Sequence, residues 1–457
     1  MHPLAFVFSI VAVGSFAAFA QVTAGTFAVD TTADTLDAKL GDGVCADTAD
    51  GHCSLRAAIQ ESNALSGADI IELPAGVFAL TIAGSDEDLA ASGDLDITED
   101  VTLSGSGTEA TVIDGGALDR VLDIPDGSGA STVRLEHLTV RNGAVVNTGL
   151  DAAGVGLHIA DAVQVALDDV VIRDNSATSA FGGIAIDSAG CIVGSHVRIL
   201  DNRDTAKNGS RSAAAGAVYL HGENSCLVLS DSEIRGNTAD WAGAIQSDFG
   251  TITIRRSLIT DNEARFAGAL LLNFDADTLL ENVTISGNRG SDGAVLNDGG
   301  SQFMLVNCTV TGNGPYDGIT GLVGGIDDVH GGFGLTFLSN TIISGNGPGF
   351  IADDCNAATS VGGGNIVGDS ENCRFDAQPS DQLDVDPELG PLADNGGFTW
   401  THLIGDAAID HAETGACPAT DQRGLPRPVD GDGDQVAACD IGAVEIQRDA
   451  IFASGFD

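Results

Sequence analysis

Basic residues are scarce in this sequence, with Lys and Arg together numbering 19 against 66 Asp and Glu. The formal net charge is −47 at pH 7. Nucleic acids and anionic lipid surfaces are bound through clustered positive charge, so this imbalance disfavours both as partners. It favours solubility and the binding of cations such as calcium.

The sequence also lacks the short motifs that mark common catalytic sites. It contains no G-x-S-x-G, no H-E-x-x-H and no phosphate-binding P-loop. Its nine cysteines include no C-x-x-C pair of the kind that holds a metal. The architecture must therefore be inferred from repeats.

A short strand-like segment closed by Asn recurs seven times, at intervals of 27, 35, 25, 26, 25 and 33 residues. A pair of small residues follows each of the first six copies and suits a tight corner. A repeat of this length with two strand signals is typical of a solenoid. The closing residues are Asn175, Asn202, Asn237, Asn262, Asn288, Asn313 and Asn346.

Two further columns of the repeat are apolar or small. Side chains alternate along a strand, so the residues three and five positions before each Asn should both fill the inside of the coil. The Asn suits a turn because it tolerates the left-handed conformation, and stacked Asn side chains can bond along the ladder. The columns are Ile172, Ile199, Ile234, Ile259, Ile285, Val310 and Ile343, and Val170, Val197, Ser232, Ser257, Val283, Cys308 and Thr341.

These patterns predict an all-β fold, a parallel β-helix solenoid, in preference to a β-sandwich. A leucine-rich repeat is disfavoured because its leucine frame and helical half are missing. Near the N-terminus, Ser54 can cap a helix in which Leu55, Ala58, Ile59 and Ser62 share a face. That helix would cover the open end of the coil, which is otherwise a bare sheet edge.

We expect four segments along the chain. Residues 1–20 are apolar and end in Ala-Phe-Ala, the pattern of a secretory signal peptide. An N-terminal cap should occupy 21–100, the β-helix 101–370 and a small tail domain 371–457. No second long apolar run follows the signal, so no transmembrane span is expected after its cleavage.

Export makes disulfides expected among the nine cysteines. Cys191 and Cys226 take equivalent positions in successive coils, where strands about 4.8 Å apart allow a bridge. Cys308 falls in an inward column and should be a buried free thiol. The remaining local pairs are Cys45–Cys53, Cys355–Cys373 and Cys417–Cys439.

Three stretches resemble known families. CSLRAAIQESNA followed by GADIIELPAGVFALT resembles the N-terminal CSLREA segment of bacterial secreted β-helix proteins, with Ala57 where the motif has Glu. LDITEDVTLSGSGTEATVIDGG and RLEHLTVRNG resemble the early coils of right-handed, pectin-lyase-like β-helices. GGFTWTHLIGDAAIDHA, DQRGLPRP and CDIGAVE resemble the choice-of-anchor Q tail domain. The resemblance implies a right-handed helix that is secreted or displayed on a bacterial surface, and it implies no catalytic residues.

One candidate ligand site lies on the edge where two coils carry longer loops. Basic groups beside stacked aromatics could bind an anionic or neutral glycan. The alternative is that the arginines pair with neighbouring acids and the aromatics pack inward. The candidate residues are Arg203, Lys207, Arg211, Trp241, Arg265, Phe266 and Arg289.

A second candidate is a column of polar residues, five positions past each corner glycine. It contains His221, Asp248, Asp298 and His330. A His beside an Asp on the next coil could perform acid–base work, and carboxylates paired across coils could hydrolyse glycosides. The alternative is that these are polar residues where a strand enters a turn.

A third candidate lies in the tail, where Asp430, Asp432 and Asp434 alternate as the first ligands of a calcium loop do. Gln435 and Ile441 break the EF-hand pattern, which leaves a different calcium loop or a plain acidic turn.

The sequence thus favours an exported scaffold for interaction or adhesion, with polysaccharide or cell-surface components as partners and carbohydrate binding as its chemistry. The alternative is a polysaccharide lyase or glycoside hydrolase that works along the loop-rich edge. Calcium is the one cofactor that the acidic composition suggests.

Overall fold

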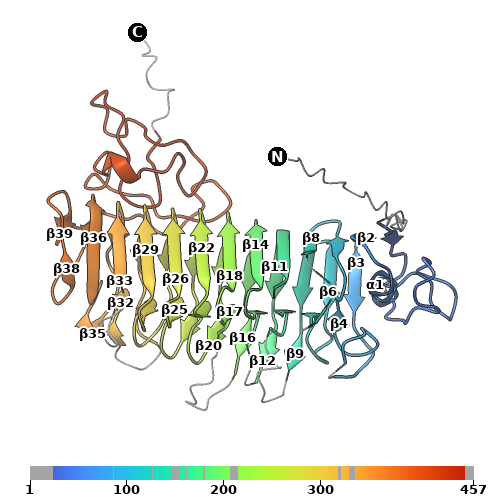
Figure 1. Ribbon diagram of the computed structural model, residues 1–457. Coiled ribbons are helices and arrows are strands. Elements are labelled where there is room, and N and C mark those ends of the chain that lie inside the picture. The colour runs from blue at the N-terminus through green and yellow to red at the C-terminus, as the bar shows by residue number, and fades with distance from the viewer. Residues whose placement is uncertain are drawn as a thin grey trace, which may run out of the picture.

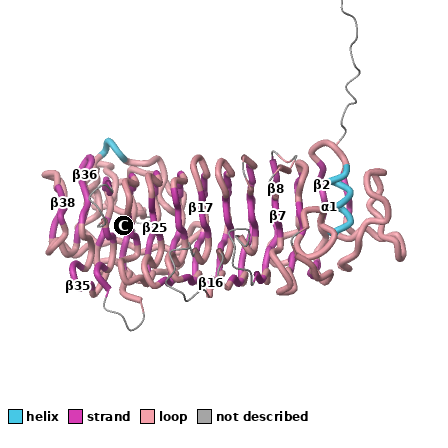
Figure 2. The backbone as a smooth tube through the Cα atoms, turned by 60° about the horizontal axis from the view of Figure 1, so that its bottom comes forward, coloured by secondary structure: helices cyan, strands magenta, loops and turns pink. Residues whose placement is uncertain are grey.

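The computed structural model describes residues 24–447 except 86, 126, 129, 131, 146–153, 161, 179–180, 206–214, 317–320 and 329–334. The expected signal peptide lies outside the described residues. The fold is a right-handed parallel β-helix, as predicted, with its strands stacked coil upon coil along one axis (Figure 1). Figure 2 follows the same coils as successive turns of one tube.

Three parallel sheets form the walls of the helix. Sheet 1 has 23 strands: β1 Thr26–Ala28, β2 Asp69–Glu72, β3 Gly76–Ala79, β5 Val101–Ser104, β6 Thr111–Asp114, β8 Thr132–Arg141, β11 Gln164–Arg173, β14 Cys191–Ser195, β15 Arg198–Leu200, β18 Cys226–Ser230, β19 Glu233–Arg235, β22 Thr251–Arg255, β23 Leu258–Thr260, β26 Asp277–Glu281, β27 Thr284–Ser286, β29 Gln302–Val306, β30 Thr309–Thr311, β33 Leu335–Ser339, β34 Ile342–Ile343, β36 Ala357–Gly363, β37 Ile366–Val367, β38 Arg374–Asp376 and β39 Gln382–Leu383.

Sheet 2 has nine strands: β4 Leu95–Asp96, β7 Leu122–Ile124, β10 Leu157–Ile159, β13 Ile184–Ile186, β17 Val218–His221, β21 Ile245–Asp248, β25 Leu270–Asn273, β28 Val295–Asn297 and β32 Ile326–Asp327. Sheet 3 has five: β9 Ala144–Val145, β12 Ser176–Ala177, β16 Arg203–Asp204, β20 Thr238–Ala239 and β24 Glu263–Ala264. A further pair joins β31 Gly321–Val323 to β35 Gly349–Ala352.

The two inward columns predicted from the repeat form the core. Every residue of both columns is at most 2% exposed. Strand pairing keeps them in line, with Ile199 opposite Ile234 and Ile234 opposite Ile259. The coil interior is therefore a continuous apolar stack in which each coil buries the face of the next.

The closing Asn residues form a buried ladder. The Nδ2 atom of Asn237 donates to Oδ1 of Asn262 at 2.9 Å and to the carbonyl of Ile199 at 2.9 Å. The backbone N–H of Asn237 donates to the same Oδ1 of Asn262 at 3.0 Å. Equivalent bonds join each Asn from Asn175 to Asn346, and Asp354 accepts from Asn346 at the end of the series.

The expectation that these Asn residues adopt the left-handed conformation was wrong. Positive φ falls one residue earlier, where glycine or aspartate can take it. The Asn side chain is thereby turned inward, where its amide satisfies backbone groups at the bend. The residues with positive φ are Asp174, Asp201, Gly236, Asp261, Gly287, Gly312 and Gly345.

Replacing Asn262 by Ala should lower the free energy of unfolding by about 3 kcal/mol, because it strands buried donors of Asn237. Urea unfolding followed by circular dichroism measures the loss. Thr251→Ala, at an exposed position on β22, is the matched control and should change stability by less than about 0.5 kcal/mol. Equal effects for the two variants would contradict a structural role for the ladder.

The predicted capping helix is confirmed. Helix α1 spans Leu55–Ala64, and the Ser54 side chain accepts from the N–H of Ala57 at 3.1 Å. The helix lies against the first coils at the blue end of the solenoid (Figure 1). The sequence analysis did not predict β1, which precedes the helix and pairs with β2 as the first strand of sheet 1.

The predicted cysteine pairs are all present: Cys45–Cys53, Cys191–Cys226, Cys355–Cys373 and Cys417–Cys439. Cys191 and Cys226 stand opposite each other on β14 and β18, as their equivalent places in the repeat implied. Cys308 is free and buried, and burial raises the pKa of its thiol to about 12. That thiol is therefore a core side chain.

The segment after β39 folds back over the outer face of sheet 1 (Figure 1). Thr284 donates to Gln422 at 2.6 Å, and Thr309 accepts from the N–H of Ala443 at 3.1 Å. Both threonines are therefore buried, although the repeat places them on the outside of the coil. The strands of sheet 1 continue to Leu383, beyond residue 370, where the β-helix was expected to end.

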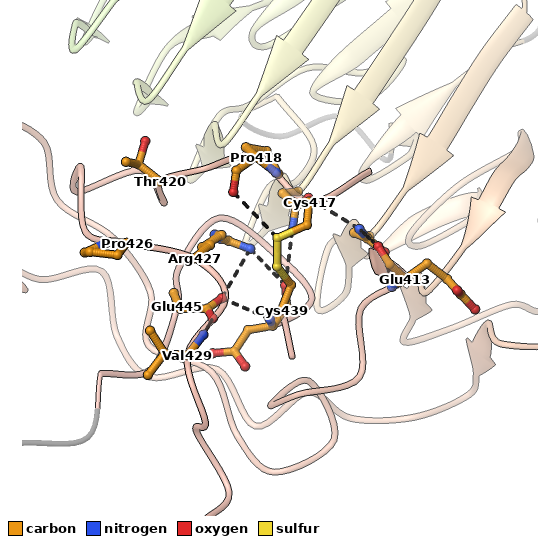
Figure 3. Close-up of a disulfide and its surroundings, with 12 residues drawn as sticks. Glu413, Cys417, Pro418, Thr420, Pro426, Arg427, Val429, Cys439 and Glu445 are labelled. Carbon is orange, nitrogen blue, oxygen red and sulfur yellow. Dashed lines mark hydrogen bonds and ion pairs between the residues drawn. A yellow bond between two sulfur atoms is a disulfide. The ribbon is translucent and has the colours of Figure 1, made fainter. Parts of the chain in front are cut away.

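The folded-back segment is organised around a buried arginine beside a disulfide (Figure 3). Arg427 donates to the carbonyls of Asp440 at 2.9 Å and Gly442 at 2.7 Å, and lies 3.6 Å from Glu445. The Cys417–Cys439 disulfide joins the same two stretches of chain. The tail thus has its own polar core.

Candidate functional site

The outer face of sheet 2 carries one side chain from each coil in register. Leu122 and Ile124 of β7 point into the core, so Asp123 between them points outward. Strand pairing extends this position along the sheet, and we call the series the outer column. It runs Asp96, Asp123, His158, Ala185, Tyr219, Gln246, Leu271, Leu296 and Asp327.

The N-terminal end of the outer column is acidic and buried. Burial, opposed by Arg120 and reinforced by Asp123, raises the pKa of Asp94 to about 7. Burial, with the charge of Asp94, raises the pKa of Asp96 to about 8. Arg120 lies 3.1 Å from Asp94 and 3.4 Å from Asp123, so one guanidinium is shared by two carboxylates.

His158 bridges three coils next to this acidic end. Its Nδ1 lies 2.6 Å from Asp123 and its Nε2 lies 3.1 Å from Asp187. Burial opposes its charge, but the bonds to the two carboxylates outweigh burial and raise the pKa of His158 to about 9. The ring is therefore a charged clamp between β7, β10 and the turn after β13.

Because the folded pKa of His158 lies above the ordinary value of about 6.5, its charge stabilises the fold fully below pH 6.5. That contribution falls as the pH rises through about 9. His158→Gln should therefore cost roughly 3 kcal/mol more at pH 6 than at pH 10.

Urea titrations of both proteins at the two pH values measure this difference. His221→Gln is the matched control, because its ring is 46% exposed and its nearest carboxylate atom is 4.0 Å away. A cost for His158→Gln that is the same at both pH values would rule out the charged clamp.

The polar column predicted at the strand ends lies two residues beyond the outer column. His221, Asp248 and Asn273 stand opposite one another, as predicted. In the coil before them the register places Asp187, rather than Ser188, beside His221. Asp298 follows β28, and His330 lies outside the described residues.

Asp248 is held by its neighbours. Tyr219 donates to it at 2.9 Å and Asn273 donates to it at 2.8 Å. Burial, together with the Asp248 charge, raises the pKa of the Tyr219 hydroxyl. Within the described chain no hydrogen bond joins His221 to Asp248, so this pair forms no acid–base couple in the structure.

The predicted basic and aromatic residues lie mainly on sheet 3 and at its junction with sheet 2. Arg203 and Arg289 occupy one column of sheet 3. Arg265 lies 5.1 Å from the ring centroid of Phe266, which stacks on Trp241 at 4.3 Å. Among the described residues, no ion pair joins these three arginines to a carboxylate. Lys207 and Arg211 lie outside the described residues.

A second aromatic pair was missed by the sequence analysis. Phe249 and Phe274 follow β21 and β25 directly, and their rings stack at 5.2 Å with 18° between planes. They are 44% and 53% exposed. Both have left-handed backbones, with φ of 71° and 52°.

The equivalent position in the flanking coils is glycine. Register places Gly222 before Phe249 and Gly299 after Phe274, with φ of 92° and 76°. The signal was present in the sequence, where His-Gly and Asp-Gly flank Asp-Phe and Asn-Phe at the same place in the repeat. Phenylalanine thus stands where the backbone favours glycine.

The two aromatic pairs belong to the same two coils. Trp241 and Phe266 precede β21 and β25, and Trp241 packs on Leu271 of the outer column. Phe249 and Phe274 follow the same strands. We call these four rings, with Asp248 and Asn273 between them, the aromatic face.

In the tail, Asp430 and Asp432 approach Asp410, with one carboxylate oxygen of each within 4.8 Å of the others. Asp434 lies outside this group, and its carboxylate accepts from the N–H of Val436 at 2.7 Å. The tail therefore brings together two of the three aspartates named from the sequence, with a third from an earlier turn.

The structure defines a protein of the right-handed parallel β-helix class, with a tail that packs on part of sheet 1. Residues 211–377 match the model of the right handed beta helix region family. A comparison with curated protein sequences gave no match. Within the described residues no helix is long and apolar enough to cross a membrane.

Among solved structures, the chain is similar to pectate lyase Pel9A, at 13% identity and a TM-score of 0.45, over 93% of this chain and 98% of that one. It is also similar to the catalytic domain of a GH87 alpha-1,3-glucanase in complex with nigerose, at 10% identity and a TM-score of 0.29, over 81% and 67% of the two chains. At these levels the likenesses carry no argument about activity.

Proposed function

We propose that this protein is an exported β-helix scaffold that binds polysaccharide on the aromatic face. The observation that carries the proposal is the exposed pair Phe249 and Phe274 at positive φ. A non-glycine residue in this conformation costs about 1–2 kcal/mol. The two rings are also exposed and stacked on adjacent coils, so they offer a ligand an apolar surface.

The surroundings of the rings suit a sugar chain. Apolar ring faces with a few fixed polar groups beside them are the usual lining of a ligand site. Asp248 and Asn273 supply an acceptor and a donor between the aromatic pairs, and their mutual bond of 2.8 Å orients both. The coils of β21 and β25 both carry this arrangement, one strand spacing apart. Such a repeat suits a polysaccharide, which is a chain of similar sugar units.

The arginines favour a sugar chain that carries carboxylates. Arg265 and Arg289 are exposed, and Arg265 lies over the Phe266 ring. Guanidinium groups bind carboxylates through paired hydrogen bonds. In a chain with a net charge of −47, exposed arginines without a carboxylate partner among the described residues are available to an anionic ligand.

Export is supported by two independent features. The disulfides join four cysteine pairs, and such bonds persist in oxidising compartments. The first 20 residues have the pattern of a signal peptide. We place the mature protein outside the cytoplasm, secreted or at the cell surface.

Affinity electrophoresis through gels containing uronate or neutral polysaccharides tests the proposal. Phe249→Asn/Phe274→Asn should weaken binding roughly tenfold or more through loss of two stacking rings. Its stability should stay within about 1 kcal/mol of wild type, because Asn adopts the left-handed conformation readily and offsets the lost stacking.

Arg265→Gln/Arg289→Gln should weaken retention by uronate gels and leave neutral gels unaffected. Val193→Thr, at an exposed apolar position on β14, is the control and should bind as wild type. Unchanged retention of the double Phe variant would reject the aromatic face. Release of new reducing ends from any polysaccharide would instead make the protein a hydrolase or lyase.

A further inference from the structure

The acidic end of the outer column contains a cluster that the aromatic face does not involve. Asp88, Asp96 and Asp123 each place a carboxylate oxygen so that the three lie within 4.8 Å of one another. Asp96 and Asp123 come from β4 and β7, and Asp88 comes from the loop before β4. Asp88 is exposed, while the other two are buried.

An unsatisfied oxygen lies in this cluster. Asp96 is 0% exposed, and its Oδ2 accepts from the N–H of Ala90 at 2.6 Å. Its Oδ1 is buried and has no hydrogen-bond partner. Leaving a buried carboxylate oxygen without a donor is costly, and a bound cation would remove that cost.

The excess of negative charge around the cluster also favours the binding of a cation. Asp94 lies near Asp96 and Asp123 of the cluster, and Asp119 lies near Asp94. Arg120 and His158 are the cations that the structure places against these carboxylates. The negative charges outnumber them, and carboxylates so close together repel unless a positive charge lies between them.

The loop that carries Asp88 is held in place from beneath. Arg56 of α1 donates to the carbonyls of Ala90 at 3.1 Å, Gly93 at 2.8 Å and Asp94 at 3.0 Å. Its guanidinium is fully buried and paired with Asp34. The capping helix thus fixes the backbone between Asp88 and Asp96 before any ligand arrives.

We propose that Asp88, Asp96 and Asp123 bind a calcium ion that ties the loop before β4 to sheet 2. Calcium prefers oxygen ligands and takes six to eight of them, with waters and backbone carbonyls completing the set. Two of the carboxylates belong to the rigid ladder and one to the loop. Magnesium needs a smaller and near-ideal octahedral site, so it is the less suited of the two ions.

Calcium should bind the full-length mature protein in isothermal titration calorimetry and raise its thermal midpoint. Asp96→Asn and Asp88→Asn should each weaken binding by at least about tenfold. The Asp88 side chain is exposed, so its variant folds regardless of the fate of Asp96→Asn. Magnesium at the same concentration should give a smaller shift of the midpoint than calcium.

Asp430→Asn is the matched control, since it disrupts the other acidic group, with Asp410 and Asp432 in the tail. It should bind calcium as wild type does at the site near β4. Loss of binding in Asp430→Asn with retention in Asp96→Asn and Asp88→Asn would overturn the proposal. The absence of calcium binding by the wild-type protein would overturn it as well.

Discussion

The buried Asn ladder is the interaction on which the rest of the structure depends. Each bend between sheet 1 and sheet 3 turns backbone groups away from the sheets, where they would be buried without partners. The Asn amides satisfy these groups and one another, from Asn175 to the carboxylate of Asp354. Because each amide bonds to the next coil, the ladder also holds the register between the coils from Asn175 to Asn346, and that register aligns their outward side chains.

A solenoid built in this way has two weak places, its ends and its outer faces. Helix α1 covers the first coils, and the tail covers part of sheet 1 through contacts such as that of Ser286 with His402 at 2.9 Å. Burial of Thr284 and Thr309 under the tail removes that part of the sheet from contact with large ligands. Phe249 and Phe274, at the exit of sheet 2, stay exposed.

Function is best sought where the repeat departs from its own rule. At the exit of sheet 2 the backbone favours glycine, which Gly222 and Gly299 supply, yet Phe249 and Phe274 stand between them. At the start of the same sheet the outer column begins with acids, Asp96 and Asp123, where later coils carry Leu271 and Leu296. Each departure costs stability in the isolated chain, the first by strain and the second by buried charge.

The sequence by itself determined the structural features that depend only on contacts between neighbouring coils. The period, the inward columns, the Asn ladder, the capping helix and the pairing of Cys191 with Cys226 all follow from contacts that recur at one coil's separation. The exit glycine and its replacement by Phe249 were also visible in the repeat. These features are predictable because each coil contacts only the coils beside it.

Only the tertiary structure decided the contacts between residues from different parts of the repeat, or between the repeat and the rest of the chain. Thr284 and Gln422 are 138 residues apart, and no pattern in either segment indicates their contact. Asp88 reaches Asp96 and Asp123 because Arg56 of the capping helix holds the intervening loop. Such contacts depend on the path of non-repeating chain, and the periodicity that makes a solenoid predictable carries no information about that path.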